Sequence, residues 1–249
     1  MSNQNIIEIN HLKKSFKGHE VLKGVSFNVK RGEIFSLLGS NGAGKTTTIK
    51  ILSTLISKYE GEINVAGLSL AKNKEKIRGM ISLTGQFASL DLVLTARQNM
   101  KTVAQLRGIK DSKHQIDGLL EKFSLTEAAD KQVSTYSGGM KRRLDIAMSL
   151  IGSPQLIFLD EPTTGIDPQN RIAMWEIIKG MAAQGVTILL TTQYLEEAEA
   201  LADTVSILDR GVIAEMGTVA ELMSKHKKET LEQVFLSIVN KADGGQLNG

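Results

Sequence analysis

The sequence has no cysteine among its 249 residues, which excludes disulfide bonds, thiol catalysis and cysteine-ligated metals. No apolar run approaches the ~18 residues that a membrane-spanning helix needs. The first residues, MSNQNIIEIN, lack the basic and then apolar pattern of a signal peptide. The net charge of +3 is too small to indicate nucleic-acid binding by itself. We therefore expect a cytosolic protein that would need a second chain for any work at a membrane.

What the sequence does have is a glycine-rich octapeptide, GSNGAGKT, from Gly39 to Thr46. It fits the pattern G-x-x-x-x-G-K-[ST], in which backbone N–H groups converge on an anion. Lys45 is placed to reach the β- and γ-phosphates of a nucleotide, and Thr46 to offer its hydroxyl to Mg²⁺. An apolar run before the octapeptide predicts a buried strand, and TTTIKILSTLI predicts a helix over 46–56. The order strand, loop and helix predicts a nucleotide-phosphate site.

Strands and helices alternate along the chain. The pattern predicts strands at 6–10, 21–29, 33–38, 61–67, 80–85, 156–160 and 186–192, and a hairpin at 204–217. Helices are predicted at 46–56, in a short charged segment after 67, within 95–123, from 137 onward, and at 168–185 and 194–203. This order indicates an α/β fold with a parallel core. The polar, glycine-rich end, KADGGQLNG, is expected to be disordered.

Two carboxylates follow the apolar run LIFLDEP. Asp160 and Glu161 would stand at the carboxyl edge of a buried strand, where an open α/β sheet places its ligand crevice. Asp160 suits a carboxylate that holds Mg²⁺, and Glu161 suits a general base or a group that orients water. In a chain with a phosphate loop, this pair predicts hydrolysis of a nucleoside triphosphate.

A second anion site is predicted where YSGGMKRRLDIAMSL begins a helix. Ser137 would cap that helix, and Gly138 and Gly139 would expose backbone N–H groups at its start. The alternative is a plain capped helix with a basic face. The presence of two anion sites in this order favours the first interpretation.

Taken together, these segments resemble the nucleotide-binding subunit of an ATP-binding cassette (ABC) transporter over roughly residues 6–220. GSNGAGKT resembles the Walker A loop, LIFLDEP the Walker B strand, and YSGGMKRR the signature segment. TTGIDP resembles the loop that follows Walker B, and Gln86 in SLTGQFASL the glutamine of the glutamine loop. The resemblance implies that Gln86 contacts both nucleotide and metal. The implied nucleotide-binding residues are Phe16, Gly39, Ser40, Asn41, Gly42, Ala43, Gly44, Lys45, Thr46, Thr47, Gln86, Ser137, Gly138 and Gly139. The implied ligands of Mg²⁺ are Thr46, Gln86 and Asp160.

Within the family, the segments TGQFASLD, TTQYLEEAEALAD and TLEQVFLSIVNK resemble the daunorubicin-resistance type of drug exporter. Most family members carry histidine where this chain has Gln193, and the exporter branch tends to carry glutamine there. The resemblance therefore implies that Gln193 donates a hydrogen bond to the γ-phosphate beside catalytic Lys45 and Glu161; a degenerate, weakly active site is the alternative. Phe16 stands where the family stacks an aromatic ring on adenine, or else it is a strand-end residue in a small cluster.

The resemblance implies a single ABC domain over 1–249. A β-subdomain with a RecA-like core would comprise about 1–85 and 137–217, a helical subdomain about 86–136, and helices with a flexible tail about 218–249. It also implies a two-fold dimer that buries ATP between subunits and drives export through a separate permease. Because this chain carries a complete set of motifs, a homodimer is sufficient. The permease groove is expected near Gln86 to Val133, where Phe87, Leu90, Leu92 and Leu94 either face the partner or pack internally.

Two other functions remain open at this stage. A soluble ABC ATPase that acts on ribosomes or DNA usually has two cassettes or long coiled coils, and this chain has one set of motifs and no sustained heptads. A nucleotide sensor without useful turnover is disfavoured by Glu161 but compatible with Gln193. We therefore expect an ATP- and Mg²⁺-dependent subunit at the inner face of the cell membrane, with no nucleic-acid partner.

Overall fold

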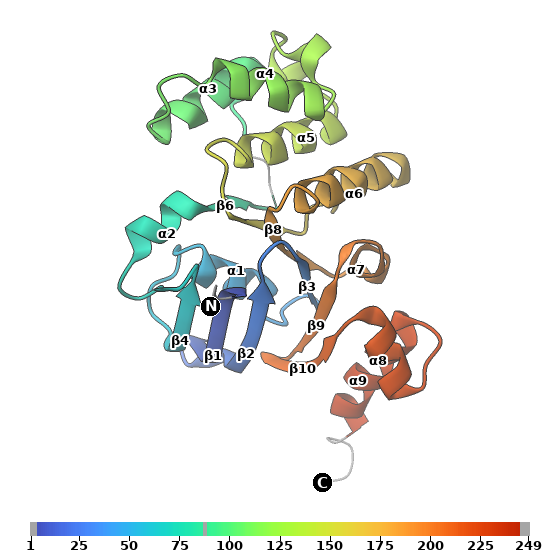
Figure 1. Ribbon diagram of the computed structural model, residues 1–249. Coiled ribbons are helices and arrows are strands. Elements are labelled where there is room, and N and C mark those ends of the chain that lie inside the picture. The colour runs from blue at the N-terminus through green and yellow to red at the C-terminus, as the bar shows by residue number, and fades with distance from the viewer. Residues whose placement is uncertain (1–3, 87–88, 245–249) are drawn as a thin grey trace.

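A computed structural model describes residues 4–86 and 89–244, and these form two sheets flanked by helices (Figure 1). The first sheet is antiparallel, with strand order β2-β1-β4-β5. Its strands are β1 (Asn5–Phe16), β2 (His19–Lys30), β4 (Glu60–Val65) and β5 (Leu68–Ser69). The first two strands are longer than the apolar alternation predicts, because register shifts let β1 pair with β2 along its whole length.

The second sheet has six strands among the described residues, in the order β10-β9-β3-β8-β7-β6. They are β3 (Ile34–Leu38), β6 (Ile81–Thr84), β7 (Leu156–Asp160), β8 (Thr187–Thr192), β9 (Thr204–Asp209) and β10 (Val212–Gly217). The pairs from β9 to β6 are parallel, and β10 closes the edge as an antiparallel hairpin with β9. This confirms the α/β fold with a parallel core.

Side chains of the central strands alternate between two cores, as the pleat of a strand requires. On β7, Ile157 and Leu159 pack into the core under the helical part, whereas Phe158 packs with the first sheet. Every residue of β3, β7 and β8 is buried. The three strands are therefore covered on both faces, and only the loops at their ends reach solvent.

The strand register brings three loops to one edge of the sheet. Leu38 at the end of β3 pairs with Thr192, and Asp160 at the end of β7 pairs with Thr191. The chain leaves β3, β7 and β8 at this common carboxyl edge. Segments that are more than a hundred residues apart in sequence therefore meet there, which is where α/β sheets place ligands.

The helices that pack against the sheets include α1 (Lys45–Leu52), α2 (Lys74–Met80), α6 (Pro168–Ala182) and α7 (Leu195–Leu201). Helix α1 ends four residues before the predicted 56. Ser53 caps it, and Thr54 turns into the left-handed region with φ of 68°. The following Leu55 is 65% exposed, so the apolar run there does not continue the buried face of the helix.

A group of helices stands over one face of the sheet, at the top of Figure 1. It contains α3 (Ala96–Leu106), α4 (Lys113–Lys122), the short η1 (Thr126–Ala128) and η2 (Val133–Thr135), and α5 (Gly138–Ser149). Thr95 and Gln98 form a capping box that starts α3. The predicted helical stretch 95–123 is thus two helices, because Gly108, with φ of 71°, ends the first of them.

The chain ends in α8 (Val219–His226) and α9 (Leu231–Gly244), which pack on β9 through Leu222, Leu231 and Val234. The prediction that 241–249 is disordered is wrong for 241–244, which continue α9; residues 245–249 lie outside the described residues. The apolar TLEQVFLSIVN segment explains the longer helix, because its Leu231 and Val234 anchor it to the core. None of the described helices is long and apolar enough to cross a membrane.

Gly61 on β4 tests how closely the strands of the first sheet approach. Its φ is +99°, and a Cβ there would lie 2.5 Å from the backbone oxygen of His11. Gly67 is the matched control, because its φ is +76° but its Cβ would meet nothing within 4 Å. Gly67→Ala should cost about 1–2 kcal/mol from backbone strain, and Gly61→Ala about 1–3 kcal/mol more because the strands must separate.

Urea unfolding followed by circular dichroism would measure this difference. Equal midpoints for the two alanine variants would contradict the close approach of β4 to the bulge at His11.

Candidate active site

The phosphate loop joins β3 to α1 and is fixed at both ends. Gly39 N–H donates to the Thr192 carbonyl at 3.2 Å, and Ala43 N–H donates to the Ser40 carbonyl at 3.2 Å. Gly44 has φ of +113°, and a Cβ there would lie 2.6 Å from Leu22, so this turn requires glycine. The middle of the loop, Ser40 to Gly42, is exposed. Thr46 and Thr47 lie in the first turn of α1, whose N-terminus faces the loop.

Lys45 lies across this loop. It is 4% exposed, and its Nζ donates to the carbonyls of Gly39 at 2.8 Å and Ser40 at 3.1 Å. The same Nζ is 3.7 Å from Glu161 Oε1. Burial lowers the pKa of Lys45, and the carboxylates of Glu161 and Asp160 oppose that shift. The ammonium is therefore held by oxygen atoms alone, and phosphate oxygens are chemically equivalent partners for it.

Asp160 joins the ends of β7 and β8 to the first turn of α1. Its Oδ1 accepts hydrogen bonds from Thr46 Oγ1 at 3.2 Å and from Thr191 Oγ1 at 2.6 Å. The carboxylate is buried at the carboxyl edge of β7, beside the first turn of α1. A carboxylate and a hydroxyl thus meet next to the phosphate loop, and both are hard oxygen donors.

Glu161 adopts an uncommon backbone conformation, with φ of 50° in a residue that is not glycine. Its N–H donates to the Thr191 carbonyl at 3.1 Å, which holds the turn against β8. Its Oε2 accepts from Gln86 Nε2 and from Thr164 Oγ1, both at 3.3 Å. Such conformations concentrate at functional sites, where the surroundings hold a strained turn in place. Gln86, which is distant in sequence, is therefore in contact with the candidate base.

The positions of Gln193 and Phe16 follow from the strands that carry them, not from contacts with the other site residues. Gln193 is half-buried and directly follows Thr192 of β8, whose register partner is Leu38, so it leaves the sheet at the edge that carries the phosphate loop. Phe16 ends β1 and is 43% exposed, with the Lys14 ammonium 4.6 Å from the centre of its ring. An exposed ring at a strand end fits a stacking surface, but here the Lys14 ammonium lies over the ring.

The glycine-rich start of α5 lies apart from the phosphate loop. Figure 1 shows α5 and α1 on opposite sides of β6 and β8. Ser137 caps α5 by accepting from Met140 N–H at 3.3 Å, as predicted. Ser137 and Gly138 are exposed, and a Cβ on Gly139 would lie 3.0 Å from the side chain of Asn170. The structure thus brings Lys45, Thr46, Gln86, Asp160 and Glu161 together, but not the Ser137 segment.

The sequence patterns do not predict two buried charged groups that lie near the site. Arg142 on α5 is 7% exposed and contacts the turns beside Gln86 and Glu161. Glu197 on α7 is fully buried and accepts from Thr163 Oγ1 at 2.7 Å. Burial raises the pKa of Glu197, and its hydrogen bonds oppose that shift. The only sequence signal for Arg142 is a basic residue on the signature helix, where a solvated face is the usual interpretation.

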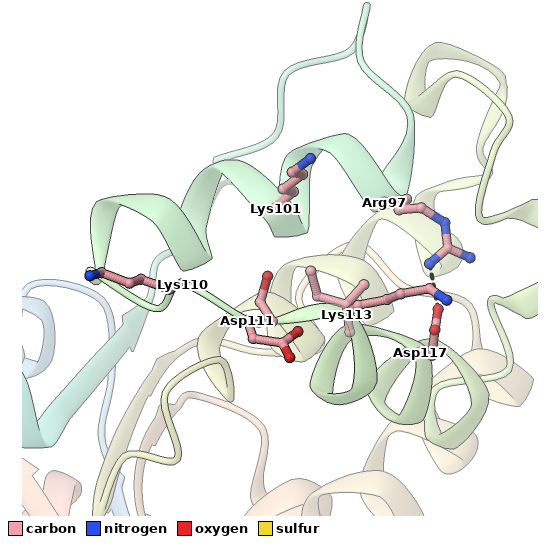
Figure 2. Close-up of a pocket in the computed structure, with 8 residues that line it drawn as sticks. Arg97, Lys101, Lys110, Asp111, Lys113 and Asp117 are labelled. Atoms are coloured by element: carbon pink, nitrogen blue, oxygen red, sulfur yellow. Dashed lines mark hydrogen bonds and ion pairs between the residues drawn. The ribbon is translucent and has the colours of Figure 1, made fainter.

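A separate cleft of about 610 Å³ opens between α3 and α4 (Figure 2). Its charged lining residues are Arg97, Lys101, Lys110, Asp111, Lys113 and Asp117. Figure 2 shows the Arg97 guanidinium directed at Asp117, and the same guanidinium also pairs with Asp130 at 3.1 Å. Charges of both signs line this cleft, and it belongs to different elements from the phosphate loop.

Comparisons with known proteins agree with this geometry. The family model described as ABC transporter matches residues 22–164. The daunorubicin/doxorubicin resistance ATP-binding protein DrrA of Streptomyces peucetius is 42% identical over 97% of this chain and 74% of that protein. The daunorubicin resistance ATP-binding protein DrrA2 of Streptomyces coeruleorubidus is 46% identical over 80% of this chain, which covers only 63% of that protein. A solved ATP binding subunit of an ABC transporter superposes with a TM-score of 0.84 at 29% identity, over 94% of this chain and 99% of the other.

A parallel sheet whose edge carries a phosphate loop, a buried lysine and two carboxylates defines the class of P-loop nucleoside triphosphatases. Within that class, the chain belongs to the ABC transporter family and is an ATP-binding, ATP-hydrolysing domain. The resemblance to daunorubicin-resistance ATPases is confirmed by the comparisons.

Lys45→Ala tests the anion site directly. The variant leaves nucleotide phosphates without their buried cation, so the affinity for ATP should fall about 10- to 150-fold, the equivalent of 1.5–3 kcal/mol for a charged hydrogen bond. Turnover should be lost with it. Lys50→Ala is the matched control, because Lys50 is an exposed lysine in the last turn of the same helix. Equilibrium binding of a fluorescent ATP analogue would measure both, and unchanged affinity in Lys45→Ala would contradict the assigned loop.

Proposed function

We propose that this chain is the ATP-hydrolysing subunit of an exporter for drug-like or natural-product molecules, and that the cargo passes through a separate membrane permease. The observation that carries the proposal is the contact of Lys45 Nζ with Glu161 Oε1 at 3.7 Å, because it joins the phosphate loop to a candidate base. The names of the daunorubicin-resistance relatives support a role in drug resistance. The direction of transport rests on this likeness.

The donor set at the edge of the sheet fits Mg²⁺. Thr46 offers a hydroxyl, Asp160 a carboxylate and Gln86 a carboxamide, and all three are hard oxygen donors. Mg²⁺ usually takes only one or two protein carboxylates and fills its octahedron with water and phosphate oxygens. When bound, the ion would neutralise charge on the transferring phosphate. We therefore propose ATP and Mg²⁺ as the cofactors of this site.

The proposed roles follow from where each side chain lies. Lys45 orients the β- and γ-phosphates, and Glu161 orients the attacking water and accepts its proton. Gln193, at the same edge, donates a neutral hydrogen bond to the γ-phosphate. The loop residues from Gly39 to Thr47 bind phosphate through backbone N–H groups, and Phe16 stacks on the base. Catalysis on this scheme consists of positioning and electrostatic stabilisation.

We propose that two ATPase subunits bury ATP between them, in a homodimer. The loop from Ser40 to Gly42 and the start of α5 at Ser137 and Gly138 are both exposed. The loop precedes α1, and α1 and α5 lie on opposite sides of β6 and β8 (Figure 1). A two-fold axis would bring the α5 start of one subunit over the nucleotide of the other. Signature residues Ser137, Gly138 and Gly139 would then contact the partner's γ-phosphate. No nucleic acid is required.

The permease contact is proposed at a groove of about 320 Å³ beside Gln86. Its lining residues are Ser53, Leu55, Arg78, Ile81, Ser82, Leu83, Ser89, Val103, Arg107, Asp145, Met148 and Ser149. We refer to this set as the β6 groove. Leu55, which lines the groove, is 65% exposed, and this favours an apolar partner segment. Leu92 is also exposed, at 47%, but it does not line the groove. Leu90 packs against the core instead, Leu94 is half-buried, and Phe87 lies outside the described residues.

The location and the domain division are part of the same proposal. The chain would be cytoplasmic and held at the inner face of the membrane by the permease. The core and β-subdomain would comprise about 1–85 and 137–217, the helical subdomain about 86–136, and the C-terminal helices about 218–249 of a single ABC domain. The proposed boundary at residue 136 places α5 outside the helical subdomain. By its contacts, α5 packs with the other helices of that group.

An assay of steady-state ATP hydrolysis, with and without the membrane protein encoded next to this chain, separates the proposal from its rivals. Stimulation by a membrane chain favours the transporter. Turnover indifferent to it favours a soluble ABC ATPase, and tight ATP binding without turnover in either condition favours a nucleotide sensor.

Glu161→Gln should keep ATP binding and block hydrolysis, because the carboxamide is nearly isosteric with the carboxylate but is a far weaker base. A dimer that persists in ATP and Mg²⁺ should then appear by light scattering. The control is Glu176→Gln, which changes an exposed carboxylate on α6 whose recorded partner is Lys179. Hydrolysis at the wild-type rate in Glu161→Gln would remove the assigned base.

Gln193→Ala should lower turnover while it leaves ADP affinity nearly unchanged, because ADP lacks the γ-phosphate that Gln193 touches. The loss of one hydrogen bond to a charged group is about 1–3 kcal/mol, or roughly 5- to 150-fold in rate. Gln193→His should stay active and add a titration near pH ~6.5. Gln184→Ala is the control, because Gln184 accepts from Lys122 far from the phosphate loop. Unchanged kinetics in Gln193→Ala with the permease present would make Gln193 a bystander.

A further inference from the structure

Arg142 is a buried guanidinium that reaches from the signature helix into two loops of the active site. Its Nε donates to the Pro162 carbonyl at 2.7 Å, and its Nη1 donates to the Gly85 carbonyl at 2.6 Å. Its Nη2 lies 3.4 Å from the carbonyls of Asp160 and Glu161. One planar group therefore spans the turn that presents Glu161 and the residue that precedes Gln86. A guanidinium has five N–H donors in a fixed fork, which suits this task.

The turn that Arg142 holds is the strained one. Glu161 has φ of 50°, and such a conformation persists only where its surroundings over-determine it. The Glu161 N–H is tied to the Thr191 carbonyl at 3.1 Å, and Arg142 binds the carbonyl side of the same turn. Gln86 Nε2 in turn contacts Glu161 Oε2 at 3.3 Å. The position of both side chains thus depends on where Arg142 sets their backbones.

Asp145 anchors Arg142 one helical turn further along α5. Its Oδ2 accepts from Arg142 Nη1 at 3.2 Å, and its Oδ1 accepts from Ser89 N–H at 3.3 Å. Burial raises the pKa of Asp145 to about 6, while Arg142 and the Ser89 N–H favour the charged form. The carboxylate is 7% exposed and also lines the β6 groove. The pair therefore connects the floor of that groove with the turn at Glu161.

A plain structural role for the pair is the competing explanation. A buried ion pair does not by itself stabilise a fold, because desolvation offsets the attraction between the charges. Here four of the five recorded partners of Arg142 are backbone carbonyls of the catalytic turn and of Gly85. Its neighbour Arg143 contacts the carbonyl of Phe123 at 3.2 Å, within the helical group. Arg142 therefore binds the loops of the active site, whereas Arg143 binds the helical group.

We propose that Arg142, anchored by Asp145, is a positioning residue for hydrolysis that holds Glu161 and Gln86 in contact with each other. Because Asp145 lines the β6 groove, the geometry of both side chains then depends on what occupies that groove. This inference rests on the proposed ATPase-permease function and adds the connection between the two surfaces. In a two-fold dimer, α5 would cover the partner's ATP while Arg142 held the base that acts on the subunit's own ATP.

Arg142→Lys keeps the charge but loses the fork, and Arg143→Lys is the matched control. We expect kcat for ATP hydrolysis to fall at least tenfold in Arg142→Lys, while the affinity for ATP measured in EDTA changes less than twofold. Deuterium exchange should increase in the backbone of 160–164 and at Gly85, Gln86 and Ser89, but not in the phosphate loop. Arg143→Lys should leave all three quantities unchanged.

A second variant guards against misfolding. Asp145→Asn keeps the shape of the anchor and removes its charge, so kcat should fall at least threefold and stimulation by the membrane protein encoded next to this chain should weaken. An unchanged kcat in folded variants, or a parallel loss of kcat and ATP affinity, would overturn the positioning role. If the unsubstituted chain does not hydrolyse ATP even with the membrane protein, the proposed function fails. Deuterium exchange still tests the connection in that case, and unchanged exchange in Arg142→Lys and Asp145→Asn would overturn it.

Discussion

The structure depends on the burial of β3, β7 and β8 side by side in parallel. Because both faces of these strands are covered, their register is fixed by two cores at once. That register sets Leu38 beside Thr192 and Asp160 beside Thr191, and so it decides which loops meet at the carboxyl edge. A slip of one residue would turn every buried side chain to the opposite core. The geometry of the site is thus a consequence of packing far from the chemistry.

The charges at that edge are balanced within the chain. The Lys45 ammonium satisfies its donors with the carbonyls of Gly39 and Ser40 and lies near the Glu161 carboxylate. A buried cation without such partners would be costly. Phosphate oxygens offer the same kind of acceptor, so on the proposed function nucleotide binding would exchange partners of Lys45 instead of creating a new buried charge. On the proposed function, the exchange would also release Glu161 from its cation and leave the carboxylate available to a water molecule.

The sequence predicts those features whose residues lie within one short segment, and it does not predict those that depend on contacts between distant segments. The phosphate loop, the Ser137 cap and the Asp160–Glu161 pair each lie within one short segment, so the sequence pattern alone predicts them. The end of α1 was wrongly predicted because apolar Leu55 follows the helix yet is exposed. Arg142 was missed for a different reason. Its partner Gly85 lies 57 residues away, and a basic residue on a helix gives no sign of a buried acceptor until the fold supplies one.

The contacts of Gln86 and Arg142 converge on one physical problem, which is the stability of the turn at Glu161. A residue at φ of 50° costs free energy that only tertiary contacts offset. The structure supplies these contacts from three elements: Thr191 on β8, Arg142 on α5 and Gln86 after β6. Helix α5 and the segment after Gln86 border the β6 groove, whereas every residue of β8 is buried in the core. A partner that moved α5 or the segment after Gln86 would therefore change the contacts that Arg142 and Gln86 make with the Glu161 turn. The hydrogen bond from Glu161 N–H to the Thr191 carbonyl would still hold the turn against β8.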